Sequence, residues 1–136
     1  GGRAVSISNI HCPMFAVAAV ADHVAPWRSV YKLHLQSDSA ELTFALTSGG
    51  HNVGIVNEPG HPRRSFQLSV CREGERFLDA ETWKERTPKF EGSWWPVWQE
   101  WLVRHSSGSE AAPAMGAPEK GYTALCEAPG TYIFQQ

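Results

Sequence analysis

The sequence predicts an α/β fold, and three observations support this prediction. Two apolar segments, Met14 to Val20 and Leu42 to Leu46, have the length and composition of strands that are buried on both faces. Between them, Ser29 to Leu35 carries apolar residues at helical spacing. Strand, helix and strand in this order form a βαβ unit, in which the strands run parallel and a right-handed crossover joins them.

Composition indicates one domain and excludes several classes of partner. The 136 residues suffice for one domain with a real core and are too few for two. Lys and Arg number 12 and Asp and Glu number 14, and this near balance argues against nucleic acid or a membrane surface recruited by charge. The longest apolar run, Met14 to Ala21, is too short for a membrane span. No signal peptide pattern begins the chain, so we expect a cytoplasmic protein.

Each predicted strand is followed by a chemically active side chain. Asp22 comes directly after the first strand, and His51 follows the second across Ser48-Gly49-Gly50. Because parallel strands end at the same edge of a sheet, we expect the two side chains to be hydrogen-bonded or one water apart. They would form the acid–histidine part of a nucleophile–acid–histidine constellation, in the chain order of α/β-hydrolases. Two alternatives stay open: Asp22 only caps the next turn, and His51 is an ordinary surface residue.

No nucleophile accompanies this pair in the sequence. A hydrolase elbow of the form G-x-S-x-G, or the same with cysteine, should lie upstream of the acid, and none precedes Asp22. Cys12 sits at the start of a strand, the wrong end of the sheet, and Cys71 and Cys126 lack flanking glycines. We expect all three to be small buried hydrophobic residues in a reducing compartment.

After His51 we expect the chain to leave the core. Ser65 to Cys71 alternates well enough for a short strand, and Asp79 to Arg86 has the pattern of a short helix. A second helix is expected from Trp94 to Arg104, with Ser93 as its N-cap. This helix is rich in tryptophan, and we expect it to pack against the sheet. Contact with polymer, substrate or a partner subunit is the alternative.

Four longer segments stand out beyond these single residues: DHVAPWRSVYKLHL, LTFALTSGGHNVGIVNEPGHPRRSFQ, GSWWPVWQEWL and APGTYIFQ. Together they closely resemble the C-terminal region of poly(3-hydroxyalkanoate) synthases, and they cover almost the whole chain. These are bacterial polyester-forming acyltransferases on an α/β-hydrolase core, in which a cysteine in a lipase-like box carries the growing chain as a thioester. The resemblance implies that the chain forms the C-terminal part of an α/β-hydrolase fold.

The resemblance also implies roles for individual residues. Asp22 in ADHVAPW matches the family's aspartate, and His51 in SGGHNVGI matches its catalytic histidine. His23, Trp27 and Asn52 beside them are candidate substrate-binding residues. His51 would take the proton of an upstream cysteine thiol, and the thiolate would attack a 3-hydroxyacyl-coenzyme A thioester. Asp22 would orient His51 or help the substrate's 3-hydroxyl to attack.

The resemblance and the local composition together predict three parts. Residues 1–105 are the C-terminal part of the catalytic domain, 106–121 a flexible Ser/Gly/Ala/Pro-rich linker, and 122–136 a tail that docks back. The implied partners are 3-hydroxyacyl-coenzyme A, the growing polyester and the granule surface. The complete enzyme would be a homodimer that needs no separate cofactor or metal.

The cysteine box of the family is missing from this sequence. We therefore expect a fragment that is inactive alone and poorly soluble, because the edges of its predicted parallel strands are open. Two other interpretations stay open. One is the C-terminal part of a serine esterase of the same fold, and the other is a non-catalytic module whose tryptophan-rich helix binds polyester or a synthase.

Overall fold

The computed structural model describes residues 2 and 4–135, and their contacts divide the chain into two compact units. The first unit ends at His105 and contains the sheet. The second begins at Ser106 and is mainly irregular. Its short 3₁₀ helices are η2 (Pro118–Lys120) and η3 (Tyr132–Phe134). Apart from Cys126, the residues described below belong to the first unit.

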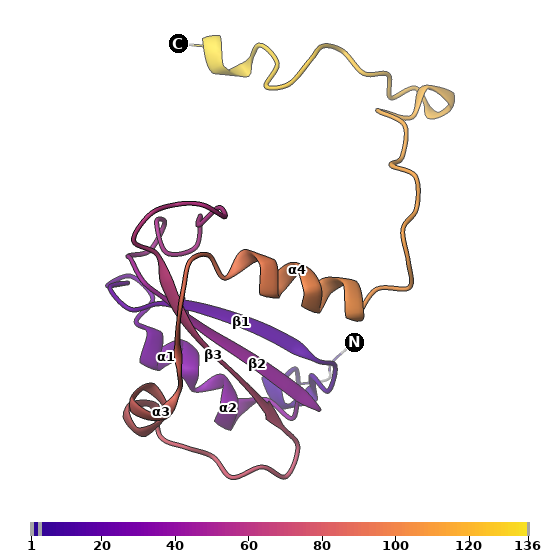
Figure 1. Ribbon diagram of the computed structural model, residues 1–136. Coiled ribbons are helices and arrows are strands. Elements are labelled where there is room, and N and C mark those ends of the chain that lie inside the picture. The colour runs from indigo at the N-terminus through magenta and orange to yellow at the C-terminus, as the bar shows by residue number, and fades with distance from the viewer. Residues whose placement is uncertain (1, 3, 136) are drawn as a thin grey trace. The chain divides into compact units, whose positions relative to one another are not determined.

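A mixed sheet with the strand order β1-β2-β3-β4 forms the centre of the first unit (Figure 1). Its strands are β1 (Met14–Ala19), β2 (Glu41–Thr47), β3 (Ser65–Arg72) and β4 (Lys89–Glu91). β1 and β2 run parallel, with Met14 opposite Leu42 and Ala19 opposite Thr47. The predicted α/β class and the parallel pairing of the two apolar segments are therefore confirmed.

β3 is an inner strand of this sheet, so the expectation that the chain leaves the core after His51 is wrong. β3 pairs antiparallel with β2 along its whole length, from Glu41 opposite Arg72 to Thr47 opposite Phe66. β4, which was not expected, pairs antiparallel with β3. The physical reason is the second edge of β2, whose N–H and C=O groups would otherwise be buried without hydrogen-bond partners.

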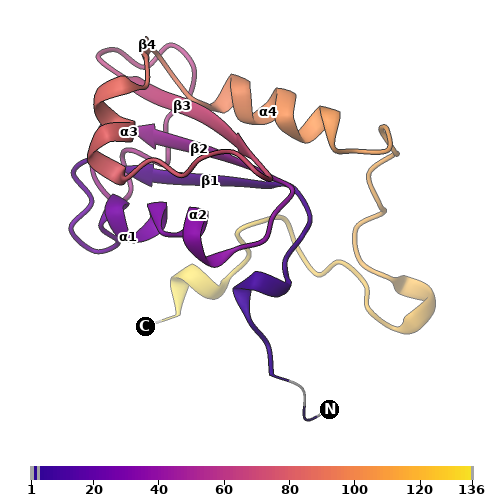
Figure 2. The same cartoon turned by 90° about the horizontal axis from the view of Figure 1, so that it is seen from below.

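Helices cover both faces of the sheet (Figure 2). On one face lie α1 (Trp27–Tyr31), α2 (Leu33–Gln36) and α3 (Ala80–Arg86), and α4 (Trp95–Arg104) lies on the other. The single helix expected over residues 29–35 is wrong, because Lys32 separates α1 from α2. The Lys32 N–H bonds to the carbonyls of Ser29 and Val30 instead of the carbonyl four residues back.

The main core lies between the strands β1 and β2 on one side and the helices α1 and α3 on the other. Phe44 of β2 is fully buried, and its ring centroid lies 5.1 Å from those of Tyr31 and Trp83, edge to face in both cases. The Trp83 indole N–H donates to the Ser69 hydroxyl at 2.6 Å, which satisfies the polar end of a buried side chain. Aromatic rings from α1 and α3 thus close over β2.

The other face is covered by α4. Phe15 of β1 stacks on Trp94 at 6.1 Å and meets Trp101 edge to face at 5.8 Å. The helix begins at Trp95, one residue later than expected, and the Ser93 hydroxyl accepts the Trp95 N–H at 3.0 Å. The expected packing of this helix on the sheet is confirmed. Within the described part of the chain, no helix combines the length and apolar character that crossing a membrane requires.

Truncating Phe44 should test the aromatic core. Phe44→Ala removes a fully buried ring that contacts both α1 and α3, and we expect it to lower the free energy of unfolding by about 3–5 kcal/mol. Urea denaturation followed by tryptophan fluorescence measures the loss. Val103→Ala, at a side chain that is 68% exposed, is the control and should change stability by less than about 0.5 kcal/mol. Equal costs for the two variants would contradict this description of the core.

Candidate active site

The ends of β1 and β2 stay joined beyond the strands themselves. The Val20 N–H donates to the Thr47 carbonyl, and the Ala21 N–H donates to the Gly49 carbonyl, both at 2.9 Å. These two bonds continue the parallel ladder into the loops that follow each strand. As a result, Asp22 and the loop that carries His51 (residues 48–57, the histidine loop) are held at the same edge of the sheet.

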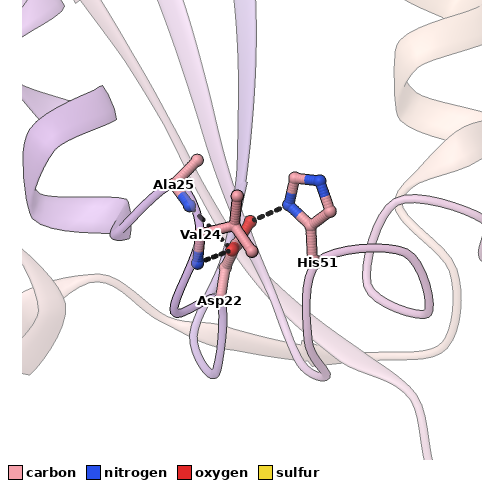
Figure 3. A network of polar contacts seen from close by, with 4 residues as sticks. All are labelled: Asp22, Val24, Ala25 and His51. Atoms are coloured by element: carbon pink, nitrogen blue, oxygen red, sulfur yellow. Dashed lines mark hydrogen bonds and ion pairs between the residues drawn. The ribbon is translucent and has the colours of Figure 1, made fainter.

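Asp22 and His51 meet at this edge (Figure 3). His51 Nδ1 lies 2.8 Å from Asp22 Oδ2, which confirms the geometry expected from the parallel strands. A carboxylate can only accept, so we assign the proton to Nδ1. The other ring nitrogen, Nε2, points away from Asp22 and carries a free lone pair when the ring is neutral.

The Asp22 carboxylate is held on both of its oxygens. Oδ1 accepts the N–H groups of Val24 at 2.8 Å and Ala25 at 2.9 Å, while Oδ2 faces His51. Asp22 therefore caps the following turn and also binds the histidine, so the alternative that it only caps the turn is wrong. The hydrogen bond from the Ala25 N–H, followed by those from His51 and Val24, holds the pKa of Asp22 below its ordinary value.

The two partners differ in exposure. The side chain of Asp22 is only 7% exposed, whereas that of His51 is 49% exposed. A covered carboxylate paired with an accessible imidazole is the arrangement expected where the carboxylate orients the ring and the ring handles protons. Chemically, the pair can accept and return a proton at Nε2.

The three candidate substrate-binding residues fall into two environments. His23 and Asn52 are exposed beside the pair. Trp27, by contrast, is 2% exposed and belongs to the core cluster, where its ring lies edge to face with Tyr31. The structure gives Trp27 a packing role, and contact of any of the three with substrate stays a prediction.

The cysteines do not approach the pair within the first unit. Cys12 precedes β1, and Cys71 lies opposite Leu42, so both sit at the far end of the sheet. The expectation that all three cysteines are buried is wrong, because Cys12 and Cys126 are exposed and Cys71 is half-buried. Burial and, secondarily, the charge of Glu75 raise the pKa of Cys71, which disfavours its thiolate.

Gly54 allows the histidine loop to sit close against β1. A Cβ atom at this position would lie 2.6 Å from the Ala19 Cβ and 2.9 Å from the Gly50 carbonyl oxygen, closer than real contacts allow. The role of this glycine is to let the backbone of the loop approach the strand.

Among the described residues, no three His, Cys, Asp or Glu side chains gather where a metal ion could bind.

The hydrogen-bond donors to Asp22 that the sequence analysis missed are the backbone N–H groups of Val24 and Ala25. The signal for them was the aspartate itself, because Asp side chains commonly accept from N–H groups two and three residues further on.

Comparison with known proteins identifies the family. The chain is 32% identical over 136 residues to poly(3-hydroxyalkanoate) polymerase 1 of Ectopseudomonas oleovorans and 34% identical over 132 residues to the poly(3-hydroxyalkanoate) polymerase subunit PhaC of Rhizobium meliloti. It is 29% identical over 132 residues to the corresponding subunit of Cupriavidus necator. These matches cover 99%, 97% and 97% of this chain but only 23%, 20% and 21% of the relatives. No protein-family model matches the chain.

The fold and the Asp22–His51 pair thus occur in a chain whose relatives are named poly(3-hydroxyalkanoate) polymerases. The chain belongs to the poly(3-hydroxyalkanoate) synthase family and corresponds to the C-terminal region of those enzymes. It spans about a fifth of the length of the relatives that it matches.

The charge on Asp22 should make stability depend on pH in the acid range. The pKa of Asp22 is lowered in the folded chain, so its contribution is complete above the ordinary value of 3.8 and is lost as the pH falls through the folded value. Asp22→Asn should therefore be less stable than the parent at pH 6, and the difference should shrink below about pH 4.

Urea denaturation at several pH values measures this difference. Asp38→Asn, which changes an exposed carboxylate away from the pair, serves as the control and should show a smaller difference at pH 6. A stability gap between the parent and Asp22→Asn that widens as the pH falls would contradict the assignment of a stabilising, ionised Asp22.

Gly54→Ala should displace the histidine loop. Its methyl group would clash with Ala19 and the Gly50 carbonyl, and we expect a loss of about 1–3 kcal/mol in the free energy of unfolding. Gly50→Ala is the matched control, because its Cβ would meet only the Ala21 carbonyl at an ordinary 3.6 Å. If Gly54→Ala proves as stable as Gly50→Ala in urea denaturation, the close seating of the loop is refuted.

Proposed function

We propose that this chain supplies the histidine base and the aspartate of the catalytic centre of a poly(3-hydroxyalkanoate) synthase, which polymerises 3-hydroxyacyl-coenzyme A and releases coenzyme A. The observation that carries the proposal is the bond between His51 and Asp22 at the edge where β1 and β2 end. The segments around both residues resemble the synthase motifs, and the relatives are named poly(3-hydroxyalkanoate) polymerases. The fold proposed for the complete enzyme is that of an α/β-hydrolase.

The proposed chemistry begins with proton transfer to His51. A cysteine thiol from another part of the enzyme gives its proton to Nε2, and the thiolate attacks the carbonyl carbon of the substrate thioester. The carbon–sulfur bond to coenzyme A then breaks, and the imidazolium returns the proton to the leaving sulfur. The acyl group remains on the cysteine as a thioester, ready to be attacked by a 3-hydroxyl group.

The geometry supports an orienting role for Asp22 over a role as a direct base. Both of its oxygens already accept hydrogen bonds, and its side chain is only 7% exposed. Oδ1 already accepts two N–H groups and Oδ2 faces His51, so little of this covered carboxylate is open to a substrate hydroxyl. The negative charge that it keeps next to Nδ1 stabilises the imidazolium formed at each proton transfer. We therefore assign His51 as the base for attack by the 3-hydroxyl as well.

For the complete enzyme we propose 3-hydroxyacyl-coenzyme A and the growing polyester as ligands and no separate cofactor. A cytoplasmic homodimer at the granule surface is part of the same proposal. These points rest on the family resemblance alone.

Substitution of His51 in the complete enzyme that contains this region tests the function. His51→Gln should lower coenzyme A release from 3-hydroxybutyryl-coenzyme A by a factor on the order of 10²–10⁴, because the thiol loses its base. Asp22→Asn should also reduce the rate, while His11→Gln, at the far end of the sheet, should leave it unchanged. Release of thiol, followed by absorbance, measures all three.

The chain by itself provides the complementary measurement. It should release no coenzyme A, because neither Cys12 nor Cys71 approaches His51. Release that disappears in Cys12→Ala would contradict this expectation. In the complete enzyme, full activity of His51→Gln would refute the proposed function, and activity that depends on a serine instead of a cysteine would favour an esterase of the same fold.

A further inference from the structure

The histidine loop, residues 48–57, has few means of its own to hold His51 in place. Its internal backbone bonds are those of turns: Gly54 N–H to the Gly50 carbonyl at 2.8 Å, and the Ile55 and Val56 N–H groups to the Asn52 carbonyl at 3.1 and 2.8 Å. His51 is exposed, and the described contact of its ring is the one to Asp22. Bonds of Gly49 to Ala21 and of Ser48 to Ser65 fix the start of the loop, so the turns after His51 need support from elsewhere.

Three consecutive residues at the start of α4 supply that support. The Trp94 indole N–H donates to the Gly54 carbonyl at 3.1 Å, and the Trp95 indole N–H donates to the Ile55 carbonyl at 3.0 Å. The Ser93 hydroxyl donates to the Asn57 carbonyl. A tryptophan N–H can only donate, so it matches a backbone carbonyl that has no partner in its own turn.

The support is anchored on the strand that carries the aspartate. Trp94 is 4% exposed and stacks on Phe15 of β1, the strand that leads directly to Asp22. The same loop meets β1 at Gly54, whose backbone lies against Ala19. Trp94 thus contacts both the loop that carries His51 and the strand that leads to Asp22.

We propose that Trp94 and Trp95 are positioning residues, whose indole N–H groups clamp the histidine loop so that His51 Nδ1 stays on Asp22. Nε2 then stays on the side of the ring that faces away from Asp22 (Figure 3). The clamp acts through the Gly54 and Ile55 carbonyls, three and four residues after the histidine. Its catalytic consequence rests on the proposed function, but the clamp itself is a property of the isolated chain.

The test uses nitrogen NMR of the full chain at a pH where the imidazole is neutral. Trp95→Phe keeps an aromatic ring and removes the N–H donor at a half-buried position. In the parent, the His51 ring should be protonated at Nδ1, and in Trp95→Phe the fraction protonated at Nε2 should rise. Hydrogen exchange of the Gly54 and Val56 amides should become about two- to ten-fold faster, the factor expected from one net hydrogen bond.

Trp98→Phe is the matched control. It makes the same change one turn along α4, at a side chain that is 38% exposed and whose ring packs on Trp94, where the phenyl ring of Phe can remain. Both the tautomer of His51 and the exchange of the loop should stay as in the parent. A purely structural role for Trp95 would lower stability and speed exchange in β1 and β3 equally, without moving the tautomer.

The outcomes separate the clamp from the proposed function. If Trp95→Phe folds and leaves both the tautomer and the loop exchange unchanged, or if Trp98→Phe changes them equally, the clamp is refuted. In the complete enzyme, Trp95→Phe should lower kcat by at least about ten-fold with little change in KM, because a displaced base loses alignment with the thiol. If His51→Gln is fully active while the tautomer still shifts in Trp95→Phe, the proposed function is refuted and the proposed clamp is supported.

Discussion

The parallel pairing of β1 with β2 is the constraint on which the rest of the structure depends. Their register runs from Met14 opposite Leu42 to Ala19 opposite Thr47, and backbone bonds extend it beyond both strands. Because the two strands end together, an aspartate and a histidine that are 29 positions apart become neighbours. The bonds from the Val20 and Ala21 N–H groups to the Thr47 and Gly49 carbonyls hold this alignment beyond the strands.

The polar groups of Asp22 and of the histidine loop have hydrogen-bond partners from successive parts of the chain. Asp22 receives two backbone N–H groups and the imidazole, which leaves neither oxygen without a partner. The carbonyls that follow His51 are satisfied in turn by the indoles of Trp94 and Trp95. The Gly54 carbonyl is buried, and a buried carbonyl without a partner costs about 1–3 kcal/mol, so the Trp94 bond stabilises the loop. The exposed face of the imidazole is the part left available for chemistry.

Local patterns were sufficient for the two parallel strands, for α3 and for the pair. The two apolar runs became parallel strands, and Asp79 caps α3 through the Thr82 N–H as a helix start should. Patterns failed where a neighbour decided the outcome. The break at Lys32 between α1 and α2 has no proline or glycine to announce it. The short β4 has only three residues, Lys89 to Glu91, too few for an alternating pattern to mark it in the sequence.

The sequence by itself determined which residues could do chemistry and at which edge of a sheet they would emerge, because strand polarity and the order of a βαβ unit follow from the chain. Only the tertiary structure decided that Trp27 is a core residue and that β3 lies beside β2. It also decided that Trp94 and Trp95 reach the histidine loop, across 40 positions of sequence. Such contacts depend on how side chains from separate elements fill one space, and no periodicity within a single segment records that.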